Sequence, residues 1–300
     1  MMNKTSNKVL KKYNVIGDDF YYHHTLTERW GKESYHAPEA HKQHEVLYLL
    51  RGEISYIIEG ETYDVKEGDM IFVAPNEIHT LKINGRLDYE RIVLLFDINL
   101  LEGIMRSLDT TLDTFRFSGK NRFHIIKKQD VKAGGLDKLL LSITEGEESD
   151  KYKRLDIMSK LIGFVIAIDK TAARMKDNFT RPTSSDRLVA AVSEYIDSHI
   201  SEPVRLDELA EALFVSKSTL CHRFAAYMNM TPAKYATLKK MYYAAGRLGE
   251  GIAASAVARE VGYENYTSFF YNYKRVMGVS PAASSRQEAA QAVNETDDKE

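Results

Sequence analysis

Short hydrophobic runs alternate with turn signals through the first third of the chain. The runs are rich in β-branched and aromatic residues, and pairs such as Glu59-Gly60 and Asn84-Gly85 separate them. Closely spaced short strands with glycine turns are typical of a β-sandwich or barrel. We therefore expect strands at residues 46–50, 54–58, 62–65, 70–73, 79–83 and 89–96.

After about residue 100 the spacing becomes helical. Apolar side chains recur every three or four residues through the segment 155–166, and a shorter segment, 136–143, can pair with it. This apolar stripe fits either packing against the strands or a helix that joins two copies of the chain. We favour a dimer helix because the stripe is broad.

Polar residues and a proline interrupt the helical pattern at residues 176–186, which predicts a linker. The last residues offer little to bury, so we expect them to be disordered. The predicted class is α+β, with a strand-rich domain at 1–115, a helical dimerisation region and linker at 116–183, an all-α domain at 184–287 and a tail at 288–300.

An internal repeat occupies the last hundred residues. A shift of 49 positions pairs Ser216 with Asn265, Leu220 with Phe269, and Phe224 with Tyr273. The paired positions are those of a helix cap and of the helix core, and the preceding alanine-containing segments also match. Each copy therefore predicts a helix, a tight turn and a second helix, the arrangement that places a recognition helix in the DNA major groove.

Charge is segregated although the net charge is only −2. Residues 212–249 and 265–287 contain no acidic residue but several lysines and arginines, so these segments can face a polyanion. Hydrophobic and charged contents of 44% and 28% are typical of a soluble globular protein, and no apolar segment is long enough for a membrane span. The single cysteine excludes an internal disulfide framework, and we expect a cytoplasmic protein.

The repeat resembles the DNA-binding domain of the AraC/XylS family of transcription regulators. The resemblance is carried by Ala258-Arg-Glu-Val-Gly-Tyr263, then Phe269, Tyr273-Lys274 and Gly278-Val-Ser-Pro281. It implies DNA contact through two sets of outward residues, which are Lys217, Ser218, Cys221 and His222 in the first copy, and Tyr266, Thr267, Phe270 and Tyr271 in the second. Where the family usually carries arginine, this chain has His222 and Tyr271.

Basic residues near the two recognition helices suit the phosphate backbone. We expect phosphate contacts from Lys217, Lys239, Lys240, Lys274 and Arg275. The aromatic positions 266, 270 and 271 suit apolar contact with thymine methyl groups. The first copy is therefore expected to carry more of the sequence specificity than the second.

The N-terminal strands are similar to the cupin-type sensor barrel of many such regulators. The similar stretches begin at His41 and end at His79, and they imply a site for a small molecule such as a sugar. Candidate ligand-binding residues are Trp30, His41, Glu45 and His79. His41 and Glu45 share strand parity, whereas His41 and His44 do not, so only the first pair can point inward with His79.

The same residues are of the types that bind a divalent metal. We favour a site with no metal and no other cofactor, because the spacing only partly matches that of metal cupins. The prediction is a non-enzymatic transcription regulator whose partners are double-stranded DNA, a small-molecule effector and a second copy of the chain, with RNA polymerase added for an activator. The alternative is a metal-dependent cupin enzyme with a fused helical module.

Overall fold

The chain divides into two compact units, one of residues 1–36 and 42–184, and one of residues 185–300 with the segment 37–41. The structure is a computed structural model that describes residues 7–14, 20–28, 34–83, 88–107, 112, 123–145, 151–175 and 182–284. Trp30, most of the predicted linker and the predicted tail lie outside the described residues. None of the described helices is both long and apolar enough to cross a membrane.

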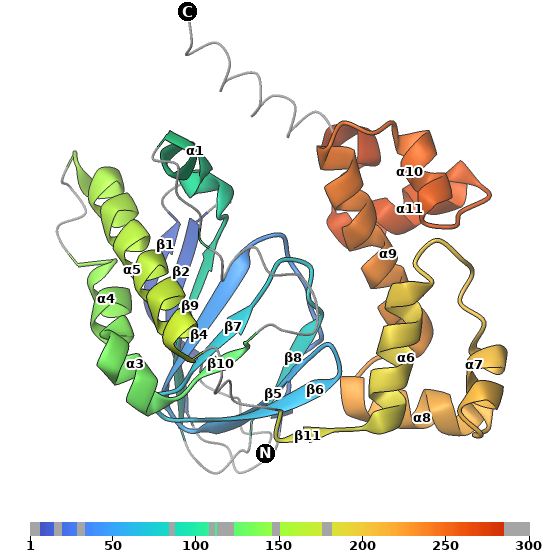
Figure 1. Ribbon diagram of the computed structural model, residues 1–300, viewed down its shortest axis with the longest axis horizontal. Coiled ribbons are helices and arrows are strands. Elements are labelled where there is room, and N and C mark those ends of the chain that lie inside the picture. The colour runs from blue at the N-terminus through green and yellow to red at the C-terminus, as the bar shows by residue number, and fades with distance from the viewer. Residues whose placement is uncertain are drawn as a thin grey trace, which may run out of the picture. The chain divides into compact units, whose positions relative to one another are not determined.

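The first unit is built from two antiparallel sheets (Figure 1). One sheet has the strand order β1 (Asn7–Asn14), β2 (Phe20–Thr27), β9 (Tyr89–Phe96), β4 (His44–Arg51), β7 (Met70–Val73) and β10 (Ile125–Ile126). The other has the order β11 (Ser184–Ser185), β6 (Glu61–Lys66), β5 (Glu53–Ile58), β8 (His79–Ile83) and β3 (Ser34–Tyr35). The expected strands between residues 46 and 96 are confirmed, but the described strands form two sheets and not one closed barrel.

Strand alternation gives the six-stranded sheet two different apolar faces. On β9, Ile92 and Leu94 belong to a core shared with helices, whereas Tyr89 and Val93 belong to the core between the sheets. The turn from β5 to β6 is the two-residue loop Glu59-Gly60, and both residues have positive φ, at 50° and 86°. That geometry matches the twist of the two strands, and glycine adopts it without strain.

Helices cover the outer face of the six-stranded sheet (Figure 1). They are α3 (Lys128–Gly134), α4 (Leu136–Ser142) and α5 (Lys153–Met175), while α1 (Asn99–Ser107) follows β9. The predicted pairing of α4 with α5 is confirmed, since Leu140 and Leu161 lie in one buried cluster. The stripe on α5 is split lengthwise, because Val165 is buried whereas Leu155 is 69% exposed and Ile166 is 39% exposed.

The second unit contains the repeat, and the predicted helix pairs are confirmed. The first pair is α7 (Leu206–Ala212) and α8 (Lys217–Met228), the second is α10 (Ala254–Glu260) and α11 (Tyr266–Met277). Helix α9 (Pro232–Gly249) connects the pairs, and α6 (Arg187–Ser198) precedes them. At about 1.5 Å per residue, the 18 residues of α9 span roughly 27 Å.

Candidate functional site

Helix α8 presents a polar face because its apolar residues lie four apart on the opposite side. The hydroxyl of Ser216 accepts a hydrogen bond from the backbone N–H of Thr219, which fixes the start of the helix. Leu220, Phe224 and Met228 are fully buried. The opposite face carries the sequence-predicted residues, of which Lys217, Ser218 and His222 are exposed and Cys221 is half-buried.

Helix α11 is divided in the same way, but its outward face is aromatic. Phe269 and Tyr273 are fully buried in a cluster shared with α9 and α10. Tyr266, Thr267, Tyr271 and Lys274 are exposed, Tyr271 to 68%, and Phe270 is half-buried against the Tyr266 and Tyr271 rings. The Asn265 side chain caps the helix by accepting from the N–H of Thr267. Each second helix therefore exposes its predicted reading face.

Acidic residues of the same unit pair with some of the predicted phosphate-binding lysines. Lys217 Nζ lies 2.8 Å from Asp207 Oδ2, and Lys239 Nζ lies 3.0 Å from Asp197 Oδ1. The hydrogen bond that Lys217 donates to the Asp207 carboxylate raises the pKa of Lys217. Lys274 and Arg275 are exposed, and Arg275 donates to Asn272 Oδ1 at 2.6 Å. Lys217 and Lys274 therefore lie on the reading faces of α8 and α11, and Arg275 lies beside the second face.

Lys240 has a different environment from the one expected. Its side chain is buried, and its ammonium donates to the backbone carbonyls of Glu202 at 2.7 Å and of Val261 at 2.8 Å. Burial lowers the pKa of Lys240. The expected phosphate contact is therefore replaced by a structural role, since the ammonium lies inside the unit and not on its surface.

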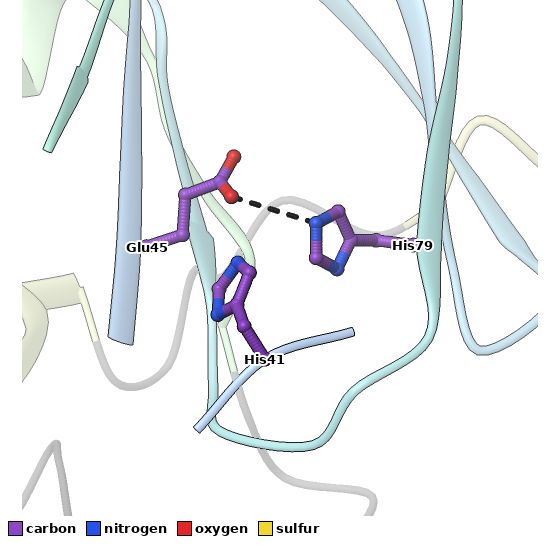
Figure 2. Close-up of side chains that lie close together, drawn as sticks. All are labelled: His41, Glu45 and His79. Carbon is purple, nitrogen blue, oxygen red and sulfur yellow. Dashed lines mark ion pairs between the residues drawn. The ribbon is translucent and has the colours of Figure 1, made fainter. Parts of the chain in front are cut away.

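In the first unit, a carboxylate and an imidazole face each other across the two sheets. Glu45 on β4 and His79 at the start of β8 point toward one another, with His79 Nε2 3.4 Å from Glu45 Oε2 (Figure 2). The hydroxyl of Tyr56 donates to the other Glu45 oxygen at 2.7 Å, and the Tyr56 and His79 rings stack. His44 stacks on Phe96 of the core shared with the helices, so it points away from Glu45, whereas His41 precedes β4 and the parity argument does not apply to it.

The geometry around Glu45 and His79 fits a metal ion as well as a polar ligand. One donor atom from each of His41, Glu45 and His79 lies within 4.8 Å of the others (Figure 2). His79 Nδ1 lies 2.9 Å from the Glu77 carbonyl, a contact that directs Nε2 toward Glu45. Two ligands at ~2.1 Å from one tetrahedral ion lie about 3.4 Å apart, the observed Glu45–His79 separation. The expectation of no metal stays a prediction.

Sequence reasoning missed a second polar group in the same unit. Tyr89 and Arg91 on β9, with Thr25 on the neighbouring strand β2, place polar atoms in its interior. The signal was available, because Tyr89, Arg91 and Val93 alternate with the apolar residues Ile92 and Leu94. An arginine at an inward position of such a strand is a candidate for binding.

Two domain models match the chain. An AraC-like ligand binding domain matches residues 23–164, and a helix-turn-helix domain matches residues 209–287. A putative AraC-like transcription regulator of Streptomyces antibioticus is 34% identical over 98 residues, so the match spans about a third of that protein. The HTH-type transcriptional regulator YbfI of Bacillus subtilis is 23% identical over 229 residues, which are 75% of this chain and 78% of the relative.

Among solved structures, ToxT of Vibrio cholerae covers 89% of this chain and 97% of its own, with 12% identity and a TM-score of 0.36. The relatives matched by sequence are described as transcription regulators. The alternative of a metal-dependent cupin enzyme is therefore not favoured.

Proposed function

This chain belongs to the AraC family of transcription regulators with an N-terminal ligand-binding domain, and on that premise we propose that it binds specific DNA under the control of a small molecule. The observation that carries the proposal is the duplicated helix pair with its two outward faces. Helices α8 and α11 each bury one side and expose the other. Helix α9 separates the two helix pairs, and we propose that the pairs enter two successive major grooves, which recur every ~34 Å along one side of B-DNA.

The DNA contacts divide between base edges and phosphates. Lys217, Lys239, Lys274 and Arg275 supply positive charge for the backbone, which positions the protein without selecting sequence. The base-reading residues are those exposed or half-buried on the two reading faces, which are Ser218, Cys221 and His222 on α8, and Tyr266, Thr267, Phe270 and Tyr271 on α11. The His222 imidazole can donate to or accept from a base edge, whereas the aromatic rings suit apolar contact.

The β-sheet unit is the sensor, and its ligand lies among Glu45, Tyr56 and His79. A carboxylate and an imidazole can bind the hydroxyl groups of a sugar, and the Tyr56 ring offers an apolar surface. Ligand binding changes the population of states in which the two helix pairs can engage an operator. A cytoplasmic location follows from this role, and an activator of this design would also contact RNA polymerase.

The exposed edge of α5 supports a homodimer. Leu155 and Ile166 are exposed, and the intervening Met158 and Ile162 are half-buried, so one apolar stripe runs along the helix. A second copy of α5 would cover this stripe and place two DNA-binding units on one operator. Such a dimer reads two half-sites.

DNA binding by the full chain tests this function. Fluorescence anisotropy with DNA from the region upstream of its own gene should show specific binding whose affinity falls steeply with salt. Lys274→Ala should weaken binding to all sequences alike and reduce the logarithmic salt slope by about 1. Lys138→Ala, an exposed lysine on α4, is the matched control and should change nothing.

Two outcomes would contradict the proposal. Absence of DNA binding at low salt, by a folded full-length protein, would remove the regulator function. A change in base preference in Lys274→Ala, with an unchanged salt slope, would contradict the phosphate role of that lysine.

A further inference from the structure

Strand β9 directs a half-buried arginine toward the interior of the sensor unit. Arg91 lies between Tyr89 and Val93, which both pack in the core between the two sheets. Its guanidinium carbon lies 4.6 Å from the centroid of the Tyr89 ring. Thr25 is the direct partner of Arg91 in the register of β2 and β9, so the two side chains lie side by side on the same face.

Three buried polar atoms belong to these neighbouring residues of β2 and β9. They are Nη1 of Arg91, the hydroxyl of Tyr89 and Oγ1 of Thr25, and none of them has a hydrogen-bond partner among the residues that the structure describes. Tyr89 is 1% exposed and Thr25 is fully buried. Buried polar groups are almost always satisfied, and a cation is the most costly to leave without a partner. All three groups can donate a hydrogen bond, and the guanidinium can only donate, so a ligand that offers acceptor oxygens suits all of them.

Acidic residues nearby are engaged elsewhere. The Glu45 carboxylate accepts from Tyr56 through one oxygen and faces His79 with the other. By contrast, Arg51 at the end of β4 is exposed and pairs with Asp88 and Glu90. Arg91 forms no ion pair within the described part of the chain, which separates it from an ordinary surface arginine.

Arg91 also makes its surroundings electropositive. Burial, and then the charge of Arg91, lower the pKa values of His23 and His36, so both imidazoles are held toward the neutral form. Burial also raises the pKa of Tyr89, which keeps its hydroxyl protonated and able to donate. One guanidinium surrounded by neutral donors matches a single negative charge better than the nearly double charge of a phosphate. The planar guanidinium fork fits a carboxylate.

We infer that the sensor unit binds the carboxylate of a small hydroxy acid, such as a sugar acid, through Arg91, Tyr89 and Thr25. This inference rests on the proposed function, because it names the ligand class of the same unit. Glu45 belongs to the same interior and, with Arg91, acts electrostatically on both His36 and Tyr89. The carboxylate therefore binds at Arg91, and the hydroxyl groups of the acid reach the Glu45–His79 pair.

Matched ligands test the inference with the full chain. Melting temperature and calorimetric binding are measured with D-glucuronate, D-galacturonate and D-gluconate, with the neutral sugars D-glucose and D-galactose, and with inorganic phosphate. At least one acid should raise the melting temperature and bind, while the corresponding neutral sugar should not. Arg91→Gln should weaken binding of that acid by at least about tenfold, and Arg51→Gln should bind it as the unaltered protein does.

Smaller changes cover the case in which Arg91→Gln fails to fold. Tyr89→Phe and Thr25→Val each remove one hydroxyl and keep the shape of the side chain. Each should lower the affinity for the acid several-fold without changing the affinity for neutral sugars. Binding of a neutral sugar as tightly as its acid would overturn the inference. Unchanged acid binding in the folded variants, binding of phosphate in place of the acids, or no response to any acid would overturn it as well.

DNA binding measured on the same samples separates this inference from the proposed function. Operator binding without any response to the acids contradicts the inference alone. If the protein binds the acid but no DNA, the regulator function is contradicted and the carboxylate site is supported.

Discussion

Replacing Lys240 by methionine should destabilise the DNA-binding unit. The ammonium of Lys240, near the middle of α9, donates to carbonyls that precede α7 and follow α10, so it joins the two helix pairs. Each hydrogen bond to a charged group stabilises the folded state by about 1.5–3 kcal/mol. Burying the ammonium also costs desolvation free energy, and a methionine side chain does not carry this cost. The free energy of unfolding should therefore fall by about 2–4 kcal/mol, which lowers the melting temperature of a unit of this size by roughly 10–25 °C.

The backbone around Lys240 leaves little room for adjustment. Gly262 has a φ of +75°, and a Cβ at this position would lie 2.5 Å from the carbonyl oxygen of Ser201. The two loops that receive the ammonium therefore approach each other closely and cannot easily find other donors. For this reason, we expect that backbone relaxation in Lys240→Met does not restore the lost free energy of unfolding.

Calorimetry of the full chain measures the effect, with Lys234→Met as the control. Lys234 lies on the same helix but is exposed, so its replacement should move the melting temperature by little. At a temperature where both variants are folded, the salt slope of DNA binding should equal that of the unaltered protein. A salt slope lowered by about 1 in Lys240→Met, with an unchanged melting temperature, would refute the structural role and restore a phosphate contact.

Three further predictions concern the reading face, the dimer and the metal. Tyr271→Arg should alter the base preference of the second half-site in a binding-site selection, whereas unchanged binding and preference would mean that α11 does not read bases. Leu155→Glu should shift the protein from dimer to monomer in analytical ultracentrifugation, and a dimer that survives it would exclude the exposed edge of α5 as the interface. Zinc titrated into apo protein should bind only weakly, and a tight stoichiometric site lost in His79→Ala would replace the sugar-type contact at Glu45 with a metal.

Local signals account for the parts of the fold that sequence predicts well. The strands β4 to β9 are short apolar runs closed by turn residues, and the repeated helices carry their own caps in Ser216 and Asn265. The left-handed residues Asn229 and Gly278 end the two second helices, a role that asparagine and glycine commonly take. Strand β1 was missed because it is lysine-rich, and its pairing with β2 decides its conformation more than its own composition does.

Positions that depend on distant partners could not be predicted. Lys240 lies in an acid-free, basic segment that suggests a surface, but its carbonyl partners lie 38 and 21 residues away in the chain. Arg91 differs, since strand parity already placed it with inward residues, and only its unfulfilled hydrogen bonds needed the structure. The local sequence pattern thus predicts which side of a helix or strand faces inward. The role of a charged side chain also depends on the groups it meets in the interior, which lie far away in the sequence.

The two reading helices combine one scaffold with two kinds of surface. Caps, buried positions and helix ends correspond between α8 and α11, so selection for folding explains these similarities. The outward faces share a hydroxyl at Ser218 and Thr267, but elsewhere α8 offers ammonium, thiol and imidazole groups where α11 offers tyrosine and phenylalanine rings. Polar groups can pair with the distinct donors and acceptors of each base pair, whereas rings distinguish mainly the thymine methyl. The first half-site should therefore tolerate fewer substitutions than the second, a difference that the scaffold alone does not produce.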